Sequence, residues 1–285
     1  MKMFLLGLII IFAVGDTWAD FQQEKKLKHT QFIERMEQAD LLYKRRGDFT
    51  QAQKALELYQ SIINGEEFPK ITVGDPLAAQ RLYLRLAMSH YFVGHHPPEG
   101  AASTSNQKQK NFLQGIEYGK KCLQSLERAG QEVTDSVKGE CYFWIATNQL
   151  LYQQERGSFS VLLNVKEVIQ NYQNAIKLFP SYNWGASYRM LGILYQRLPG
   201  VFGGSNNASM EYYKKAIEIA PDEPLNYLFL GKLYTELAKS KKEILTLVDQ
   251  GLIKVGESIS EERYESCGAL VELKHYKQHQ KWPEE

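Results

Sequence analysis

The chain of 285 residues carries 34 basic and 33 acidic side chains, which leaves a net charge of +1. This balance excludes a long-range attraction to nucleic acid, because such binding depends on clustered Lys and Arg that neutralise phosphates. The length is enough for a large core in one extended domain or two compact ones.

The N-terminus has the three parts of a secretory signal peptide. Lys2 supplies a basic start, Met3 to Val14 form an apolar run, and Thr17-Trp18-Ala19 ends the segment with small residues at the spacing of a cleavage site. A membrane-spanning helix needs roughly 20 apolar residues, so the run is too short to be one. We expect a signal peptide over residues 1–19, cleavage after Ala19, and an exported chain without a membrane span or a lipid-anchoring Cys.

One short phrase recurs along the chain and places a large ring, an aliphatic residue and a small residue at helical spacing. The three residues share one stripe of a helix, and the small one lets a second helix approach closely. The copies are Tyr83-x-x-Leu86-Ala87, Tyr142-x-x-Ile145-Ala146, Tyr188-x-x-Leu191-Gly192 and Tyr227-x-x-Leu230-Gly231.

A second helical phrase follows several of these copies. The segments 171–180 and 212–221 both end in Pro, which cannot continue a helix, and 115–126 is a looser copy without it. Residues 40–62 form a degenerate first pair. This alternation resembles the tetratricopeptide repeat, a helix-turn-helix unit that is stable only when stacked.

The predicted fold is all-α, a right-handed superhelix of about five such repeats with irregular insertions. It forms one domain over residues 20–285, with the best repeat match at 139–251. Successive small residues of the phrase lie 59, 46 and 39 positions apart, more than the ideal period of about 34. The excess is expected in loops or extended helices, with loops at His95–Lys110, from Ser158-Phe159-Ser160 onward, and at Leu198–Asn207.

The three cysteines are Cys122, Cys141 and Cys267. Cys122 and Cys141 fall on neighbouring predicted helices and could pair in an exported protein. An odd number of cysteines on apolar helix faces favours buried free thiols instead. None has a second Cys or His at the spacing of a metal site.

The segment Leu198 to Ser205 reads Leu-Pro-Gly-Val-Phe-Gly-Gly-Ser and predicts a structural turn formed by Pro199, Phe202, Gly203, Gly204 and Ser205. Adjacent glycines allow backbone conformations closed to other residues, and Ser205 or Asn206 can cap the helix expected near Ala208. A tight turn anchored by Phe202 is favoured over an anion site at that helix N-terminus.

Three successive segments together carry a more specific resemblance. Tyr-Arg-Met-Leu-Gly-Ile-Leu-Tyr at 188–195, the Leu198 turn, and Lys-Ala-Ile-Glu-Ile-Ala-Pro at 215–221 resemble the T component of TRAP transporters. That family has a Gly-x-x-Tyr helix, a Pro-x-x-Phe-Gly-Gly-Asp turn and a Lys-Ala-Ile helix that ends in Pro. Ser205 stands where the family usually has Asp, which weakens the cap but leaves the turn.

The resemblance implies a periplasmic protein that associates with a solute-binding protein of a TRAP system. It also implies self-association, as a trimer, with ligand passing through clefts or a pore in the helical assembly.

A ligand or partner groove is expected along the inner edge of the first helix of each repeat. This edge consists of the residues that directly follow the ring and the small residue in each copy of the phrase. Mixed apolar and basic side chains there would suit an organic anion or an acidic peptide, although a solvated or ion-paired role for the arginines is the simpler alternative. The groove residues are Phe143, Thr147, Arg189, Ile193, Arg197, Leu228 and Lys232.

Metal and catalytic chemistry are not expected. His95-His96 lies in a predicted loop, and His275 with His279 shares a helix face, but neither pair has a third ligand or a Glu base. The chain has no nucleophile elbow and no phosphate-binding Gly loop. We therefore predict a protein without cofactors that is not an enzyme.

The sequence favours a periplasmic accessory component of a TRAP-type transport system that binds a solute-binding protein and a small organic ligand. The alternative is a general periplasmic repeat scaffold that binds proteins during envelope assembly. Repeat solenoids serve many partners, so the fold by itself does not choose between these two functions.

Overall fold

The computed structural model describes residues 2–69, 71, 75–96, 104–129, 135–257, 259–260 and 262–283, and for residues 2–21, 76, 128 and 129 the backbone alone. Throughout these ranges every regular element is helical, and no strand occurs. The predicted all-α helical repeat architecture is therefore confirmed.

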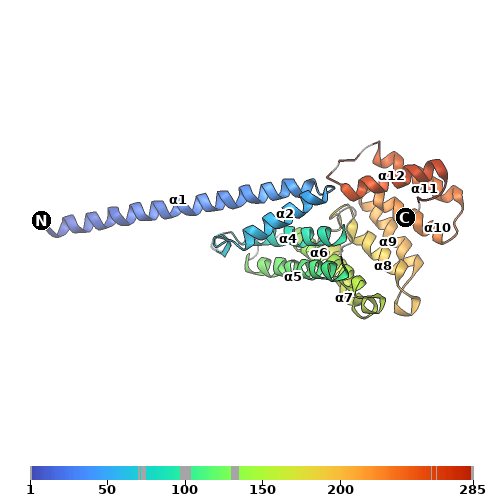
Figure 1. The fold of residues 1–285 in the computed structure, drawn as a ribbon, viewed down its shortest axis with the longest axis horizontal. Coiled ribbons are helices and arrows are strands. Elements are labelled where there is room, and N and C mark those ends of the chain that lie inside the picture. Colours follow the sequence, from blue (N-terminus) through green and yellow to red (C-terminus); the bar gives the residue numbers. More distant parts are fainter. Residues whose placement is uncertain are drawn as a thin grey trace.

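The helices follow one another as antiparallel neighbours along the chain (Figure 1). In the described ranges five pairs are followed by a last helix, α12, which packs on α10 and α11. The pairs are α1 (Lys2–Lys44) with α2 (Phe49–Ile63), α4 (Pro76–His95) with α5 (Ser105–Ala129), α6 (Asp135–Glu155) with α7 (Ser158–Leu178), α8 (Ala186–Arg197) with α9 (Asn206–Ile219), and α10 (Pro224–Glu236) with α11 (Lys241–Val255), before α12 (Tyr264–His279).

The lengths of the helices explain the irregular repeat spacing. Helices α4, α5, α6 and α7 have 20, 25, 21 and 21 residues, whereas α8 to α11 have 12 to 15. The extra residues of the early repeats therefore extend helices. The loop predicted to begin at Ser158-Phe159-Ser160 is wrong, because Gly157 (φ 104°) ends the connection and α7 starts at Ser158. Likewise, 105–110 belong to α5, while 97–103 of that predicted loop lie outside the described residues.

Small residues on the repeat stripes allow close contacts between paired helices. A Cβ atom on Gly192 of α8 would lie only 2.5 Å from the ring of Tyr213 on α9. Tyr213 is fully buried, and its hydroxyl donates to Gln196 Oε1 at 2.8 Å. The hydrogen of Gly192 therefore lets a large aromatic ring lie flat against the α8 backbone.

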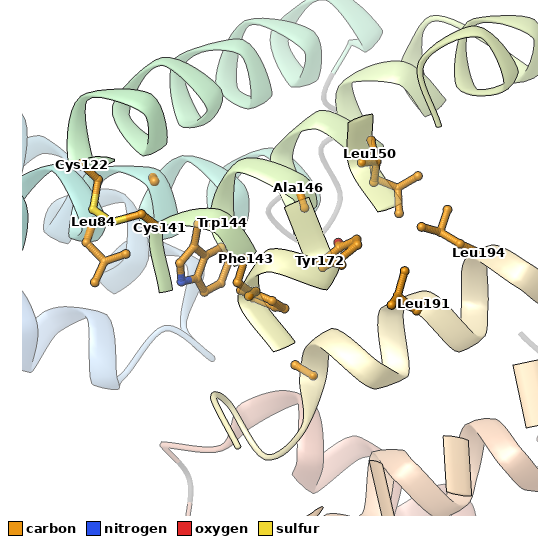
Figure 2. Packing of buried hydrophobic residues seen from close by; sticks show 14 of the residues in the cluster. Leu84, Cys122, Cys141, Phe143, Trp144, Ala146, Leu150, Tyr172, Leu191 and Leu194 are labelled. Carbon is orange, nitrogen blue, oxygen red and sulfur yellow. A yellow bond between two sulfur atoms is a disulfide. The ribbon is translucent and has the colours of Figure 1, made fainter. Parts of the chain in front are cut away.

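The largest buried cluster runs through α4 to α8 (Figure 2). Phe143, Trp144 and Leu150 of α6 pack in it with Tyr172 of α7 and Leu191 of α8. A second cluster joins α1, α2 and α4, and a third joins α9 to α12. Partly buried side chains of α4 contact both the first and the second cluster, so these two clusters join at α4.

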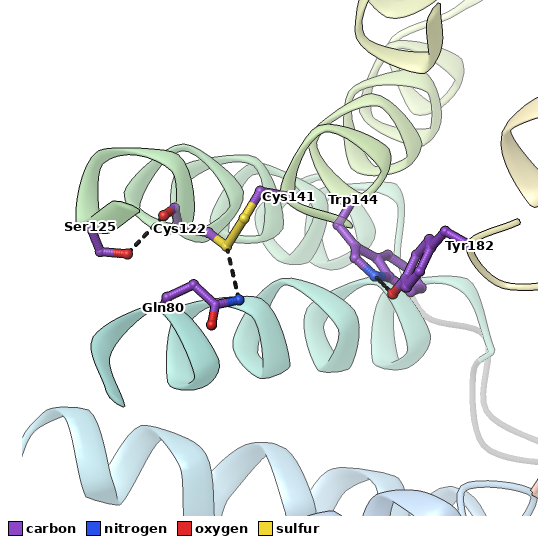
Figure 3. The surroundings of a disulfide bond; sticks show 6 residues. All are labelled: Gln80, Cys122, Ser125, Cys141, Trp144 and Tyr182. Atoms are coloured by element: carbon purple, nitrogen blue, oxygen red, sulfur yellow. Dashed lines mark hydrogen bonds between the residues drawn. A yellow bond between two sulfur atoms is a disulfide. The ribbon is translucent and has the colours of Figure 1, made fainter. Parts of the chain in front are cut away.

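Cys122 of α5 and Cys141 of α6 form a disulfide, with their Cα atoms 5.9 Å apart (Figure 3). The expectation that free thiols are favoured is wrong for these two residues, because their helices bring both side chains into the same buried contact. Gln80 Nε2 of α4 approaches Cys122 Sγ at 3.9 Å. Cys267 remains a free thiol.

The backbone of α1 is helical from Lys2 to Lys44. The side chains of the predicted signal peptide, residues 1–19, lie outside the described residues, so its cleavage after Ala19 stays a prediction. A search of the described residues finds no helix with the length and hydropathy to cross a bilayer.

Reduction of the Cys122–Cys141 disulfide is expected to lower the free energy of unfolding by about 3 kcal/mol, because the bond closes a short loop in the unfolded chain. Urea unfolding with and without reductant measures the loss, and the Cys141→Ser variant should reproduce it. Cys267→Ser is the control and should leave stability unchanged. Equal midpoints for reduced and oxidised protein would contradict the prediction.

Gly192→Ala should destabilise the protein by about 1–3 kcal/mol, since the new methyl group collides with Tyr213. Gly268 is the matched control, because it also lies inside a helix but a Cβ atom there meets nothing within 4 Å. Gly268→Ala should stabilise α12 by roughly 0.5–1 kcal/mol through helix propensity. Thermal unfolding measures the change in melting temperature of each variant, which should fall for Gly192→Ala and rise for Gly268→Ala. A change in the same direction for both would refute the close-contact argument.

Candidate functional site

A cavity of about 320 Å³ lies among the repeats; we call it the central cavity. Its walls come mainly from α4, α6, α8, α10 and α12, together with the turn that joins α7 to α8. The lining residues include Tyr91 and His95 of α4, Phe143, Trp144, Thr147, Leu150, Leu151 and Gln154 of α6, Asn183 and Trp184 of the turn, Ala186, Arg189, Met190 and Ile193 of α8, Leu225 and Phe229 of α10, Glu265 and Ser266 of α12, and Arg46, Glu223 and Arg263.

The last helix, α12, lies beside the C-terminal end of α1, so the last part of the superhelix returns to its first repeat (Figure 1). Arg46, just after α1, donates through Nη2 to Glu265 Oε2 of α12 at 3.1 Å. Tyr264 packs edge-on against Phe92 of α4, with ring centroids 6.0 Å apart. Arg46 of the first repeat and Glu265 of the last helix therefore meet at one wall of the cavity.

Helix α6 supplies the largest share of the wall. Ten of its residues are buried, including the continuous run from Phe143 to Leu150, as expected for a helix surrounded by others. Thr147 Oγ1 donates to Phe143 O at 2.9 Å and lies 3.1 Å from the Tyr172 hydroxyl. The polar atom of Thr147 thus has partners within the protein.

The turn between α7 and α8 has an unusual backbone. Asn183, Trp184 and Gly185 have φ values of 45°, 54° and 73°, all in the left-handed region. Non-glycine residues in this region carry strain, which often marks binding sites. The turn is held by the Tyr182 hydroxyl, which accepts from Trp144 Nε1 at 2.7 Å (Figure 3). Trp184 stays 38% exposed and lines the cavity.

Arg189 is the most unusual side chain of the wall, because only 6% of it is exposed. Its Nη1 donates to the Trp184 carbonyl and to Asn226 Oδ1. Burial lowers the pKa of the guanidinium, while Glu223 and Glu265 oppose that shift from a distance. An arginine remains charged at neutral pH even so.

The two carboxylates of the cavity are held by other arginines. Glu223, only 1% exposed, accepts from Arg263 Nη2 at 2.6 Å, Ser266 Oγ at 2.9 Å and Leu225 N at 3.0 Å. Arg263 also stacks over the Trp184 ring at 4.2 Å. Glu265 pairs with Arg46 as described above.

Four of the residues predicted for the groove line the central cavity, namely Phe143, Thr147, Arg189 and Ile193. The other three lie elsewhere. Leu228 is buried in the core of α9 to α12, Lys232 pairs with Glu272 at 2.8 Å, and Arg197 is exposed at the end of α8.

The residues of the predicted structural turn form a compact connection before α9. Backbone hydrogen bonds close it, from Phe202 N and Gly204 N to Pro199 O at 2.9 and 3.1 Å. Gly203 has a φ of 92°, and Ser205 Oγ caps α9 by accepting from Ala208 N at 3.2 Å. The ring of Phe202, which was expected to anchor the turn, is 49% exposed.

Sequence reasoning missed the two ion pairs of the cavity, Arg46 with Glu265 and Arg263 with Glu223. Arg46 and Glu265 lie 219 positions apart, and no periodic pattern connects them. Trp184 could have been found from the sequence. It stands directly before Gly185, in the short segment after Pro180, where a turn between two helices is expected. Among the residues that the structure describes, no group of three or more His, Cys, Asp and Glu side chains is placed to hold a metal ion.

Comparison with known proteins gives one family match. The family described as TRAP transporter T-component matches residues 101–243, half of the chain. This range contains α5 to α10 and therefore the α6, α8 and α10 walls of the cavity. No curated protein matches the chain.

Glu223→Gln should lower the free energy of unfolding by about 3 kcal/mol, because it removes one partner of a buried ion pair. Asp222→Asn is the matched control, since Asp222 contacts the same Arg263 at 3.4 Å but its side chain is 55% exposed. An exposed pair of this kind contributes about 0–1 kcal/mol. Urea unfolding of both variants tests the difference, and similar losses would show that burial of Glu223 has no special weight.

Proposed function

The chain belongs to the TRAP transporter T-component family, whose role is accessory to TRAP transport, and from this we propose that it binds a solute-binding protein and holds a small organic ligand in the central cavity. The protein is mature from Asp20 and acts in the periplasm. We also propose that it assembles with copies of itself as a trimer, and the family relationship alone supports this part of the proposal.

The central cavity is the observation that carries the ligand part of this proposal. Its walls come from the first helices of successive repeats, α4, α6, α8 and α10, and partly buried apolar side chains such as Ile193 and Phe229 face it. Small-molecule sites are typically concave, largely apolar and equipped with a few polar groups that orient the ligand. A volume of about 320 Å³ falls at the lower end of the range for such sites.

The location rests on two independent considerations. Accessory proteins of this family are associated with the periplasmic side of the transport system. The basic Lys2, the apolar run of Met3 to Val14 and the small residues up to Ala19 fit an export signal. N-terminal sequencing of the exported protein should begin at Asp20.

A pull-down from periplasmic extract tests the partner. The bait is the tagged mature protein from Asp20, with the tag alone as control, and mass spectrometry identifies what is retained. We expect specific recovery of one solute-binding protein, because the family's role requires contact with the transport system. Sedimentation of the purified bait measures the predicted trimer separately.

Two outcomes would contradict this proposal. Recovery of envelope-assembly proteins with no solute-binding protein among them would favour the general scaffold. Recovery of no specific partner, from extract in which the solute-binding protein is detected, would remove the docking role.

A further inference from the structure

One of the arginines that line the central cavity forms no ion pair with a described carboxylate. Within the described residues, three arginines and two glutamates line it. Glu223 pairs with Arg263 at 2.6 Å and Glu265 pairs with Arg46 at 3.1 Å. No ion pair joins the third arginine, Arg189, to a carboxylate in this part of the chain. Arg189 is therefore the lining arginine without a direct carboxylate partner, although Glu223 and Glu265 act on it from a distance.

Arg189 also has N–H groups that donate to no described residue. The hydrogen bonds it makes to described residues leave from Nη1 alone, toward Trp184 O and Asn226 Oδ1. Its Nε and Nη2 carry the other N–H groups, and these two nitrogens can donate a bidentate pair of hydrogen bonds to one carboxylate. A buried charge with unused donors is costly unless an anion meets it.

The remaining wall is apolar and suits a hydrocarbon body. Phe143 of α6, Ile193 of α8, and Leu225 and Phe229 of α10 all line the cavity. Ile193 lies one helical turn beyond Arg189, so a ligand whose head reaches the guanidinium extends its body along this face. A second negative charge would meet Glu223 and Glu265, whose arginines are already engaged.

We propose that the central cavity binds a small monocarboxylate with an apolar body, whose carboxylate pairs with Nε and Nη2 of Arg189. The apolar body packs against Phe143, Ile193 and Phe229. This assignment names the ligand class of the proposed function and rests on its ligand-binding part, not on the solute-binding protein.

Isothermal titration of the purified mature protein with octanoate tests the assignment. The neutral comparison is 1-octanol, which keeps the hydrocarbon chain, and the doubly charged comparison is octanedioate. Octanoate should bind at least about 30-fold more tightly than 1-octanol, as a charge-assisted hydrogen-bonded pair predicts. Octanedioate should bind more weakly than octanoate.

Two variants separate the role of Arg189 in binding from its role in the fold. Arg189→Gln should abolish the preference for octanoate, but it also disturbs the contacts to Trp184 and Asn226. Ile193→Asp keeps Arg189 and places a carboxylate one turn away, within reach of the guanidinium. This variant should stay folded and lose octanoate binding, because its own carboxylate takes the place of the ligand's.

Arg197→Gln is the matched control, since Arg197 is an exposed arginine on the same helix. It should bind octanoate as the wild type does. The assignment is overturned by equal affinities for octanoate and 1-octanol, by the absence of saturable octanoate binding, or by full binding in a folded Ile193→Asp variant. Octanoate binding through Arg189 together with a pull-down that recovers no solute-binding protein would leave the site intact and remove only the transport role.

Discussion

The buried side-chain amide of Asn226 joins the segments on which the central cavity depends. Its nitrogen donates to the carbonyls of Ala216 and Ala220 at the end of α9, at 2.9 and 3.1 Å, and its oxygen accepts from Arg189. Arg189 in turn donates to the carbonyl of Trp184. One amide thereby fixes the end of α9, the face of α8 and the left-handed turn relative to α10, and buried polar groups joined in this way specify one arrangement of their helices.

The return of α12 to the first repeat gives the repeats a cavity with walls on several sides, where an open solenoid would have a continuous groove. Helices α8 to α11 are short, and α12 reaches back to the first repeat, where Arg46 and Glu265 pair. Phe92 and Tyr264 add an aromatic contact beside that pair. An open solenoid exposes its concave face along its whole length, whereas here the first repeat and the last helix both contribute to a single wall.

Helix periodicity was enough to predict the fold and part of the candidate site. The ring-aliphatic-small phrase places Leu191 and Gly192 against the neighbouring helix, and one step around the helix from it lie Arg189 and Ile193. Leu228 occupies the equivalent position of α10, but its side chain is 3% exposed and packs in the core cluster of α9 to α12, away from the central cavity. The disulfide and the Arg46–Glu265 pair depend on how helices meet in space, which a pattern along one helix does not contain.

Arg189 is hard to explain by stability alone. Replacing a buried charged group by an apolar residue of similar volume is often neutral or stabilising, and the neighbouring wall is already apolar. Local rules are commonly broken where a protein performs its function. The strained Trp184 turn and the Arg189 guanidinium share a hydrogen bond, so both unusual features of the wall occur at the same place. Trp184 lines the cavity and is 38% exposed, so the strained turn, its tryptophan and Arg189 together distinguish this wall from a helix surface that serves packing alone.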